Sequence, residues 1–588
     1  MSILAPPYLK IAEDLRANDD QWRAYGSKGD CVILAGPGSG KTKTITLKIA
    51  RLLAEDVHRP RRIACITYSN ACAGELGARL AKLGVEDGGR LALSTVHSFC
   101  LTELVSPYAG MAGIAVPNPL KVAMPAQSRE LFKQAYQQKV GGNPSSSFRM
   151  SCDRLRRTIP DRESQEWRDW SYRETQVVEV YEELLLRNGL IDFDGLVLAG
   201  LRLVEDHKWI RKAIRAKYPV IVIDEYQDLG LPLHRIILAL KRAGIRILAV
   251  GDPDQSIYGF TGAQPALLRA LSRLPRVDAV TLKLNYRCAE KIIAASRALL
   301  PEPENYRSHD GREGEILIHR LECGIRQQAD YALSTLVPAM LKANPSWVPG
   351  HIALLYRSLH EGAAIAEAAD ALALRYFRLD NGSPIKRSRL AGWLTEAAQW
   401  CSGGWQTGQI TLAQLLKGWR RLFRAPASES EQFALRRHLI HALFALRGGS
   451  QLLRPWLLAL REGVLGEVLA QEPGLADEQE NLIDLISATA KGGPLESFTV
   501  EIFGNQGKSP DQLNLMTLHS SKGLEFQAVI MIGLEEGAFP SSYDKTEEQL
   551  QEAARLFYVG VTRAKSQVHL IYDCNESSFI ATVREATK

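Results

Sequence analysis

The sequence predicts an α/β fold built on parallel β-sheets, and three observations lead to that prediction. Residues 31–44 (CVILAGPGSGKTKT) read as a buried strand, a glycine-rich turn and the start of a helix. Residues 221–228 (IVIDEYQD) are an apolar run that ends in two carboxylates, Asp224 and Glu225. Strand and helix patterns then alternate along the chain, as a doubly wound parallel sheet requires.

The glycine-rich turn has the spacing of a phosphate-binding P-loop, with Ala35 in the place of its first glycine. Small residues let backbone N–H groups approach a triphosphate closely. Lys41 offers a charge to the β- and γ-phosphates, and the Thr42 hydroxyl suits Mg²⁺. Asp224 suits the same metal, and Glu225 suits a water that attacks the phosphate. The two motifs in this order predict an enzyme that hydrolyses nucleoside triphosphates.

Polar and aromatic residues follow three further expected strands. Residues 61–70 end in TYSN, residues 92–98 form a strand that ends at His97 and Ser98, and residues 247–263 run from a buried strand into a polar turn with two aromatics. Open parallel sheets bind ligands at the carboxyl ends of their strands. We therefore expect these segments to contribute to binding sites.

The composition indicates a multidomain protein of the ordinary globular class. The chain has 588 residues, too many for a single core, and 46% of them are apolar. It contains no run of about 18 apolar residues, which argues against a membrane span, and its N-terminus has no signal-peptide pattern. The nine cysteines are scattered without metal-ligand spacing. A cytoplasmic protein fits these features best.

The net charge of +6 is a weak indication of a polyanionic partner. Residues 149–168 and 417–424 concentrate arginine beside tryptophan. Each segment is equally consistent with a solvated helix face and with a nucleic-acid contact.

In order along the chain, the motifs resemble those of superfamily 1A helicases of the UvrD/Rep/PcrA type. This chain has DDQ (19–21), AGPGSGKT (35–42), TYSN (67–70), TVHSF (95–99), DFDGL (192–196), DEYQD (224–228), GDPDQSIYGF (251–260), LNYR (284–287), LLYRS (354–358), MTLHSSKGLEF (516–526), EEGAFP (535–540) and RLFYVGVTRAK (555–565). The set runs from residue 19 to residue 565. The resemblance implies two RecA-like P-loop motor domains with parallel sheets, each carrying a mainly helical insertion.

For the nucleotide, the resemblance implies that Gln21 reads the adenine edge, Tyr286 stacks on the base and Glu525 binds the ribose. Gln255 is implied to report the γ-phosphate or its attacking water to the DNA side. Planar guanidinium groups suit phosphoryl oxygens better than lysine does. The expected catalytic residues are Lys41, Asp224, Glu225, Gln255, Arg287 and Arg563; the nucleotide-binding residues are Gln21, Gly36, Gly38, Ser39, Gly40, Lys41, Thr42, Lys43, Tyr286 and Glu525; and the magnesium ligands are Thr42 and Asp224.

For nucleic acid, the resemblance implies aromatic side chains that stack on single-stranded bases. Such stacking contributes about 1–3 kcal/mol per base and tolerates any sequence. Other positions are implied to contact the backbone or to couple the two sites. The expected nucleic-acid residues are Thr67, Tyr68, Asn70, His97, Tyr258, Phe260, Arg357 and His519.

The spacing of the motifs predicts where the insertions lie. Long motif-free stretches separate His97 from Asp192 and Arg357 from Thr517, and parts of them read as amphipathic helices. We expect motor domain 1A over residues 1–105 and 190–284, insertion 1B over 106–189, motor domain 2A over 285–382 and 506–588, and insertion 2B over 383–505.

The leading expectation is an ATP-dependent translocase on single-stranded DNA and a DNA helicase, moving 3′ to 5′ as the resemblance implies. ATP and Mg²⁺ are the implied cofactors, and single-stranded or tailed duplex DNA the partner. The alternative is an ATPase subunit that senses DNA ends or structures and activates a separately encoded nuclease without processive unwinding. Compact helicases of this type occur in defence assemblies such as Gabija. A metabolic P-loop kinase explains neither GDPDQSIYGF nor VGVTRAK.

One position departs from the family pattern. The third motif commonly reads GFRGA or GWRGA, whereas this chain has GFTGA, with Thr261 in the place of the arginine. No neighbouring residue in the sequence obviously replaces that charge. We expect a slower motor that depends more on DNA or on a partner, and we expect Thr261→Arg to raise DNA-stimulated turnover several-fold.

Overall fold

The computed structural model describes residues 7–85, 89–301, 305–322, 324–380, 382–386, 388–408, 410–422, 429–471, 475–506 and 509–588. The chain divides into two compact units. Unit 1 comprises residues 1–314, 543–562 and 582–588, and unit 2 comprises residues 315–542 and 563–581.

Unit 1 is built on a parallel sheet with the strand order β3-β2-β4-β5-β1-β6. Alternate residues of its central strands belong to two hydrophobic clusters, one on each face. Because both faces are buried, these strands read as nearly continuous apolar runs in the sequence. The strands are β1 (Asp30–Ala35), β2 (Ile63–Thr67), β3 (Leu91–Thr95), β4 (Val220–Ile223), β5 (Arg246–Gly251) and β6 (Val277–Leu282).

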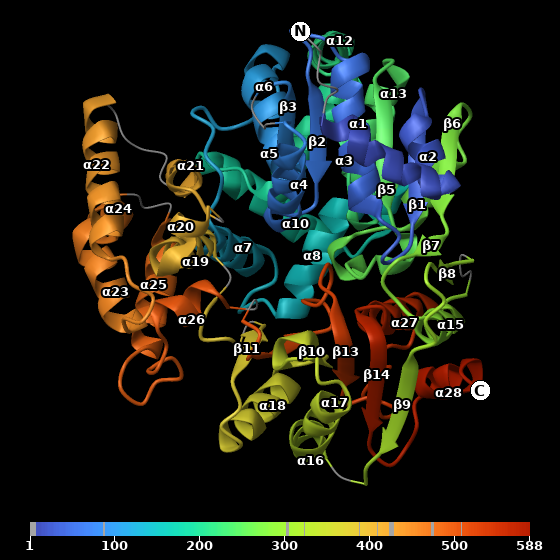
Figure 1. Ribbon diagram of the computed structural model, residues 1–588. Helices are drawn as coiled ribbons and strands as arrows, with labels where there is room; N and C mark the ends of the chain where they lie inside the picture. Colours follow the sequence, from blue (N-terminus) through green and yellow to red (C-terminus); the bar gives the residue numbers. More distant parts are fainter. Residues whose placement is uncertain are drawn as a thin grey trace, which may run out of the picture. The chain divides into compact units, whose positions relative to one another are not determined.

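Helices cover both faces of this sheet (Figure 1). Helices α3 (Lys41–Glu55) and α4 (Asn70–Lys82) contribute to the core on one face, and α11 (Phe193–Asp206) and α13 (Leu231–Arg242) to the core on the other. Unit 1 also contains α1 (Pro7–Ala12), α2 (Asp19–Gly26), α5 (Val96–Phe99), α6 (Ser106–Ala112), α12 (Lys208–Lys217), α14 (Ala266–Ser272), α15 (Glu290–Ala298), α27 (Glu547–Val561) and the short strands β7 (Leu284–Asn285) and β8 (Arg307–Ser308).

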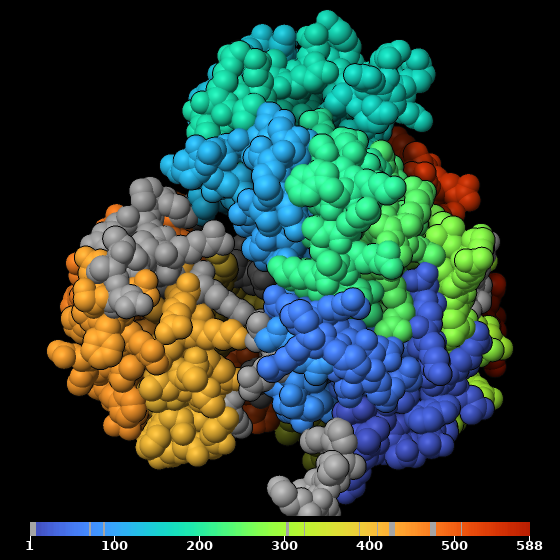
Figure 2. Space-filling model, turned by 90° about the horizontal axis from the view of Figure 1, so that it is seen from above, coloured from blue at the N-terminus to red at the C-terminus, as the bar shows by residue number. Residues whose placement is uncertain are grey.

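Between β3 and β4 the chain forms a helical segment with its own small core. Phe132, Leu155, Trp167 and Tyr181 are buried together there. In the space-filling view this segment is the teal lobe at the top, beside the blue and green surface of the same unit (Figure 2). Its helices are α7 (Pro125–Lys139), α8 (Ser146–Thr158), α9 (Gln165–Asp169) and α10 (Tyr172–Arg187).

Unit 2 contains a second parallel sheet, with the strand order β11-β12-β10-β13-β14-β9. Its strands are β9 (Glu315–Arg320), β10 (Ile352–Tyr356), β11 (Tyr376–Leu379), β12 (Leu513–Thr517), β13 (Phe526–Met531) and β14 (Ala564–Tyr572). Helices α16 (Ile325–Tyr331), α17 (Val337–Ala343) and α18 (Leu359–Ala371) belong to this unit, and α28 (Ser578–Ala586) begins in it.

A second helical segment lies between β11 and β12 in the sequence. Its core includes Trp393, Trp400, Trp419 and Trp456. Its helices are α19 (Arg389–Gln399), α20 (Trp405–Thr407), α21 (Leu412–Leu422), α22 (Glu429–Ala445), α23 (Leu453–Leu460), α24 (Gly466–Gln471), α25 (Ala476–Ala488) and α26 (Val500–Gly504). In the parts of the chain that the structure describes, no helix combines the length and apolarity that a membrane crossing requires.

The predicted fold class is confirmed: the protein is α/β, with two parallel sheets and a mainly helical segment inserted in each sheet's sequence. The expected domain bounds stay a prediction. One expected strand end is wrong, because β3 stops at Thr95 and His97 and Ser98 lie in the short helix α5. The cause is local: the Thr95 hydroxyl accepts a hydrogen bond from the Ser98 N–H at 3.3 Å and caps the helix.

Candidate nucleotide and nucleic-acid sites

The P-loop lies between the end of β1 and the start of α3 in unit 1. Gly38 and Gly40 have φ angles of 66° and 80°, which side-chain-bearing residues rarely adopt. A Cβ at Gly36 would come within 2.5 Å of the Tyr306 ring, and a Cβ at Gly40 would meet the amide of Gln21. The turn therefore needs glycine at these positions, and a close-fitting backbone cradle results.

Residues from two distant segments meet beside this cradle. The Gln21 Nε2 donates to the Ser39 carbonyl at 2.9 Å, and Asn18 caps α2 by accepting from the Gln21 N–H. The Asn18 Nδ2 also donates to the Tyr286 hydroxyl at 3.0 Å. The Tyr286 ring is 41% exposed and lies 4.5 Å from the His309 ring. Gln21, Ser39 and Tyr286 thus come together, as a site for a flat base requires.

The phosphate end of the cradle holds a lysine among carboxylates. The Lys41 Nζ lies 3.7 Å from a Glu225 carboxylate oxygen. Burial and the Glu225 charge raise the pKa of Asp224 to about 7, and Lys41 opposes that rise. Burial likewise raises the pKa of Asp252, again opposed by Lys41. Lys41 is therefore a cation that offsets the charge of these three acids.

The donor set fits Mg²⁺ as it is bound in phosphate-binding proteins. Thr42 is the second residue of α3, after Lys41, and Asp224 follows β4 at the same edge of the sheet. In the described part of the chain, no three His, Cys, Asp or Glu residues are grouped to hold a metal by themselves. Magnesium usually takes one or two protein oxygens together with phosphates and waters, so a larger cluster is not needed. Lys43, which is also expected at the nucleotide, pairs with Asp14 at 3.2 Å.

Hydrogen bonds lead from Glu225 into the segment after β5. Gln227 donates to the Glu225 carboxylate and accepts from the Asp252 N–H at 3.0 Å. The Gln255 Nε2 donates to Asp252 at 2.6 Å, and the Ser256 hydroxyl donates to the Gln227 carbonyl at 3.1 Å. Since all five residues belong to unit 1, the carboxylate and the loop are linked within one unit.

Three aromatic side chains lie together next to the segment in which these hydrogen bonds end. The Tyr68 and Tyr258 rings are stacked with centroids 5.5 Å apart, and Phe260 lies 6.2 Å from Tyr258. Phe260 is 45% exposed. Thr67 is buried at the end of β2 and donates to the Ser69 carbonyl. We call Tyr68, Tyr258 and Phe260 the aromatic face.

His97 lies on α5, with its ring 5.0 Å from the Phe193 ring. Burial lowers the pKa of His97, Asp194 opposes this, and the Arg157 charge adds to the lowering. The imidazole is therefore neutral at pH 7 and can serve as donor or acceptor. Asn70 begins α4, but its side chain lies outside the described residues.

Three of the expected site residues in unit 2 are Arg357, His519 and Arg563. Arg357 follows β10, and its guanidinium donates to the Ala538 carbonyl at 2.9 Å and lies over the Phe539 ring. His519 lies in the turn after β12. Arg563 directly precedes β14, is buried and donates to the Leu524 carbonyl at 3.2 Å.

The remaining two positions have clear partners as well. Glu525 pairs with Lys565 at 2.8 Å in unit 2. Arg287 belongs to unit 1, where its Cβ would meet a Cβ placed on Gly38 and its guanidinium donates to the Thr562 carbonyl at 3.4 Å. Arg287 therefore lies beside Gly38 of the P-loop, and its role at the phosphate stays a prediction.

Sequence reasoning missed Asn18, Tyr306, Gln227, Phe193 and Arg157 as parts of these sites. Asn18 had a usable signal, because asparagine before Asp-Asp is typical of a helix N-cap. The other four depend on contacts between distant segments.

The family comparisons agree with this geometry. The family described as UvrD/REP helicase N-terminal domain matches residues 17–275, and the UvrD-like helicase C-terminal domain matches residues 476–575. The chain belongs to the UvrD/Rep/PcrA-type helicase family. Members of this family are ATP-dependent DNA helicases, so the enzyme class is hydrolase.

Three relatives of this helicase illustrate the likeness along most of the chain. ATP-dependent DNA helicase Rep of Escherichia coli is 26% identical over 94% of this chain and 90% of the relative. DNA helicase II of Escherichia coli is 26% identical over 94% and 84%. ATP-dependent DNA helicase PcrA of Leuconostoc citreum is 25% identical over 92% and 80%.

Proposed function

We propose that this helicase hydrolyses ATP to move 3′ to 5′ along single-stranded DNA and to separate the duplex ahead of it. One observation supports this most strongly. Hydrogen bonds, the first part-buried and the others buried, run from Glu225, beside Lys41, to the segment that carries Tyr258. A translocase needs its phosphate state and its grip on the strand to be coupled, and a contiguous packed path is a physical means of coupling.

At the nucleotide, each group has a proposed task. Gln21 and Tyr286 hold the adenine, while the P-loop N–H groups and Lys41 hold the phosphates. When bound through Thr42 and Asp224, Mg²⁺ neutralises charge on the phosphate oxygens. Glu225 orients and deprotonates the attacking water.

Gln255, Arg287 and Arg563 have the remaining proposed tasks at the γ-phosphate. Gln255 responds to the phosphate through Asp252, with which it shares a 2.6 Å hydrogen bond. Arg287 and Arg563 stabilise charge on the transferring group. Glu525 holds the ribose, and Lys43 lies next to Thr42 at the start of α3.

At the nucleic acid, the aromatic face stacks on bases and binds any sequence. We assign backbone contacts to Thr67, Asn70, His97, Arg357 and His519. The pairing of stacking residues with backbone contacts suits a motor that must move over every sequence it meets.

A strand-displacement assay tests the proposal. Duplexes with a 3′ or a 5′ single-stranded tail are incubated with ATP and Mg²⁺, and release of the labelled strand is followed. We expect release from the 3′-tailed duplex alone. The double change Tyr258→Ala with Phe260→Ala should slow release at least tenfold, whereas Tyr172→Ala, an exposed aromatic on α10, should leave it unchanged.

Two results would redirect the proposal. Release from the 5′-tailed duplex would reverse the polarity. ATP hydrolysis that rises with DNA but releases no strand would favour the DNA-sensing role, in which the ATPase activates a separately encoded nuclease.

A further inference from the structure

Two consecutive arginines near the end of α8 have different surroundings. Arg156 is 1% exposed and binds both Asp192 carboxylate oxygens, at 2.6 and 2.8 Å, as well as Glu182 at 2.7 Å. Arg157 is 34% exposed. Neighbouring positions on a helix point about 100° apart. The Arg156 side chain therefore points into the core of the insertion, and the Arg157 side chain points away from it.

The Arg156 cluster fixes the insertion to the motor. Asp192 caps α11 by accepting from the Gly195 N–H at 2.8 Å, and it also accepts from the Tyr181 hydroxyl at 3.0 Å. Arg162 joins through Glu182 at 2.7 Å. Because these groups satisfy each other, Arg156 has a structural role.

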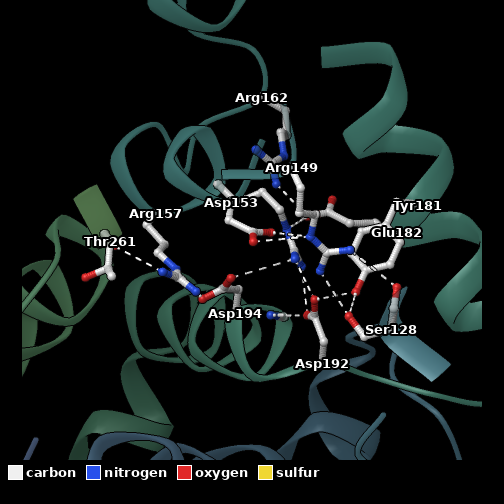
Figure 3. Close-up of polar contacts among 12 residues, drawn as sticks. Ser128, Arg149, Asp153, Arg157, Arg162, Tyr181, Glu182, Asp192, Asp194 and Thr261 are labelled. Atoms are coloured by element: carbon white, nitrogen blue, oxygen red, sulfur yellow. Dashed lines mark hydrogen bonds and ion pairs between the residues drawn. The ribbon is translucent and has the colours of Figure 1, made fainter. Parts of the chain in front are cut away.

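Only some of the hydrogen-bond donors of the Arg157 guanidinium have partners. Its Nε donates to Asp194 at 2.8 Å, and its Nη1 donates to the Thr261 carbonyl at 3.3 Å (Figure 3). Among the described residues, Nη2 has no hydrogen-bond partner. A guanidinium has five N–H donors in a planar fork, so three of the Arg157 N–H groups, including both on Nη2, remain able to donate to an anion.

The position of Arg157 is beside the aromatic face. A Cβ at Gly262 would come within 2.9 Å of the Arg157 Cβ, so α8 packs directly on the loop that follows Phe260. The Arg157 charge also lowers the pKa of His97, and Tyr68 raises the pKa of Arg157, so both side chains lie near it. The loop itself, residues 258–262 (YGFTG), carries no basic side chain.

We propose that Arg157 binds a backbone phosphate of a single strand lying on the aromatic face, and so contributes from the helical insertion a charge that loop 258–262 lacks. This inference rests on the proposed function. Stacked bases bring a phosphate with each nucleotide, and neutralising it requires a cation next to the stacking residues. Arg157 is a partly exposed guanidinium that contacts this loop, and its forked donors suit phosphate oxygens.

The test measures binding of a fluorescein-labelled oligodeoxythymidylate to the full chain at several salt concentrations. The slope of log K against log salt is negative, and loss of one phosphate contact should make it shallower by about 0.7. We expect Arg157→Gln, which keeps a donor for the Thr261 carbonyl, to weaken binding about tenfold with that change in slope. Arg157→Lys keeps the charge and should keep the native slope.

The matched control is Arg187→Gln, which removes an exposed arginine from α10 of the same insertion. It should leave affinity and slope unchanged. Equal slopes for the native chain and Arg157→Gln, or the same change in Arg187→Gln, would overturn the inference. If the native chain itself does not bind the oligonucleotide, the proposed function fails instead.

Discussion

Glu225 lies just after β4 with a φ of 53°, a left-handed conformation that costs a non-glycine residue about 1–2 kcal/mol. Gln227 holds its carboxylate, and Lys41 lies 3.7 Å away. Strain of this kind persists only where the surroundings fix it. The arrangement aims one acid at the phosphate site while its neighbour Asp224 remains buried.

This geometry predicts that two substitutions stop ATP turnover by different routes. Lys41→Ala removes a phosphate contact, so it should weaken ATP binding at least tenfold and abolish hydrolysis. Glu225→Gln keeps the shape and leaves Asp224 in place, so ATP should bind with near-native affinity while hydrolysis falls at least a hundredfold. Nucleotide-binding titration and steady-state hydrolysis on each variant make the comparison. Near-native turnover in Glu225→Gln would assign the water-activating role to another group.

Single residues differ in how far the sequence could predict them. Gln21, Lys41 and Tyr286 could be named as candidates because each lies in a sequence motif, and their roles stay predictions. Tyr306 was not, since its ring closes over Gly36 across 270 residues of chain. Pairings of that kind depend on the folded topology, and no local pattern records them.

At the scale of elements, the junction between the insertion and α11 depends on buried charge. Burial by itself would raise the pKa of Asp192, but Arg156 and the Gly195 N–H lower it to about 2. A carboxyl whose pKa is lowered on folding stabilises the fold above its ordinary pKa, near 4. That contribution is lost as the pH falls through about 2.

We therefore predict that Asp192→Asn destabilises the insertion at pH 7 by about 3 kcal/mol, because Arg156 stays buried with one partner fewer. Hydrogen exchange of peptides from α8 and α10 measures this locally. The native chain should lose protection between about pH 4 and pH 2, whereas the variant should show little further loss there. Glu183→Gln breaks an exposed pair on α10 and is the control, with an expected change below about 0.5 kcal/mol. Equal protection in Asp192→Asn and the control would mean that the cluster does not hold the insertion.

The elements themselves were predictable to different degrees. Apolar runs ending in motif residues located β1, β2, β4 and β5, because strands buried on both faces need continuous apolar sequence. The arginine-rich segment 149–168 was left open between a solvated face and a nucleic-acid contact. The structure shows Arg149, Arg156 and Arg162 engaged in internal ion pairs, which charge counting cannot reveal.

For the whole molecule, the proposed function requires that DNA bound to the aromatic face accelerate hydrolysis at the P-loop. The sequence suggested that Thr261 leaves this step short of a charge, with no replacement nearby. The structure brings Arg157 to the Thr261 carbonyl from a helix more than 100 residues away in sequence. Arg157 therefore brings to this loop a guanidinium of the kind that position 261 lacks.

The last prediction tests whether Arg157 takes the place of an arginine at position 261. The sequence alone predicts a several-fold gain from Thr261→Arg, but the contact of Arg157 with Thr261 changes that expectation. With Arg157 in place, Thr261→Arg should change DNA-stimulated ATPase less than twofold, because two guanidinium groups would compete for one phosphate and repel each other. In the Arg157→Gln background, where stimulation is reduced, adding Thr261→Arg should restore most of it. A double-mutant cycle on turnover at saturating single-stranded DNA measures the coupling directly. A several-fold gain from Thr261→Arg alone, with no restoration in the double variant, would mean that the two positions act independently and that the native loop lacks the charge outright.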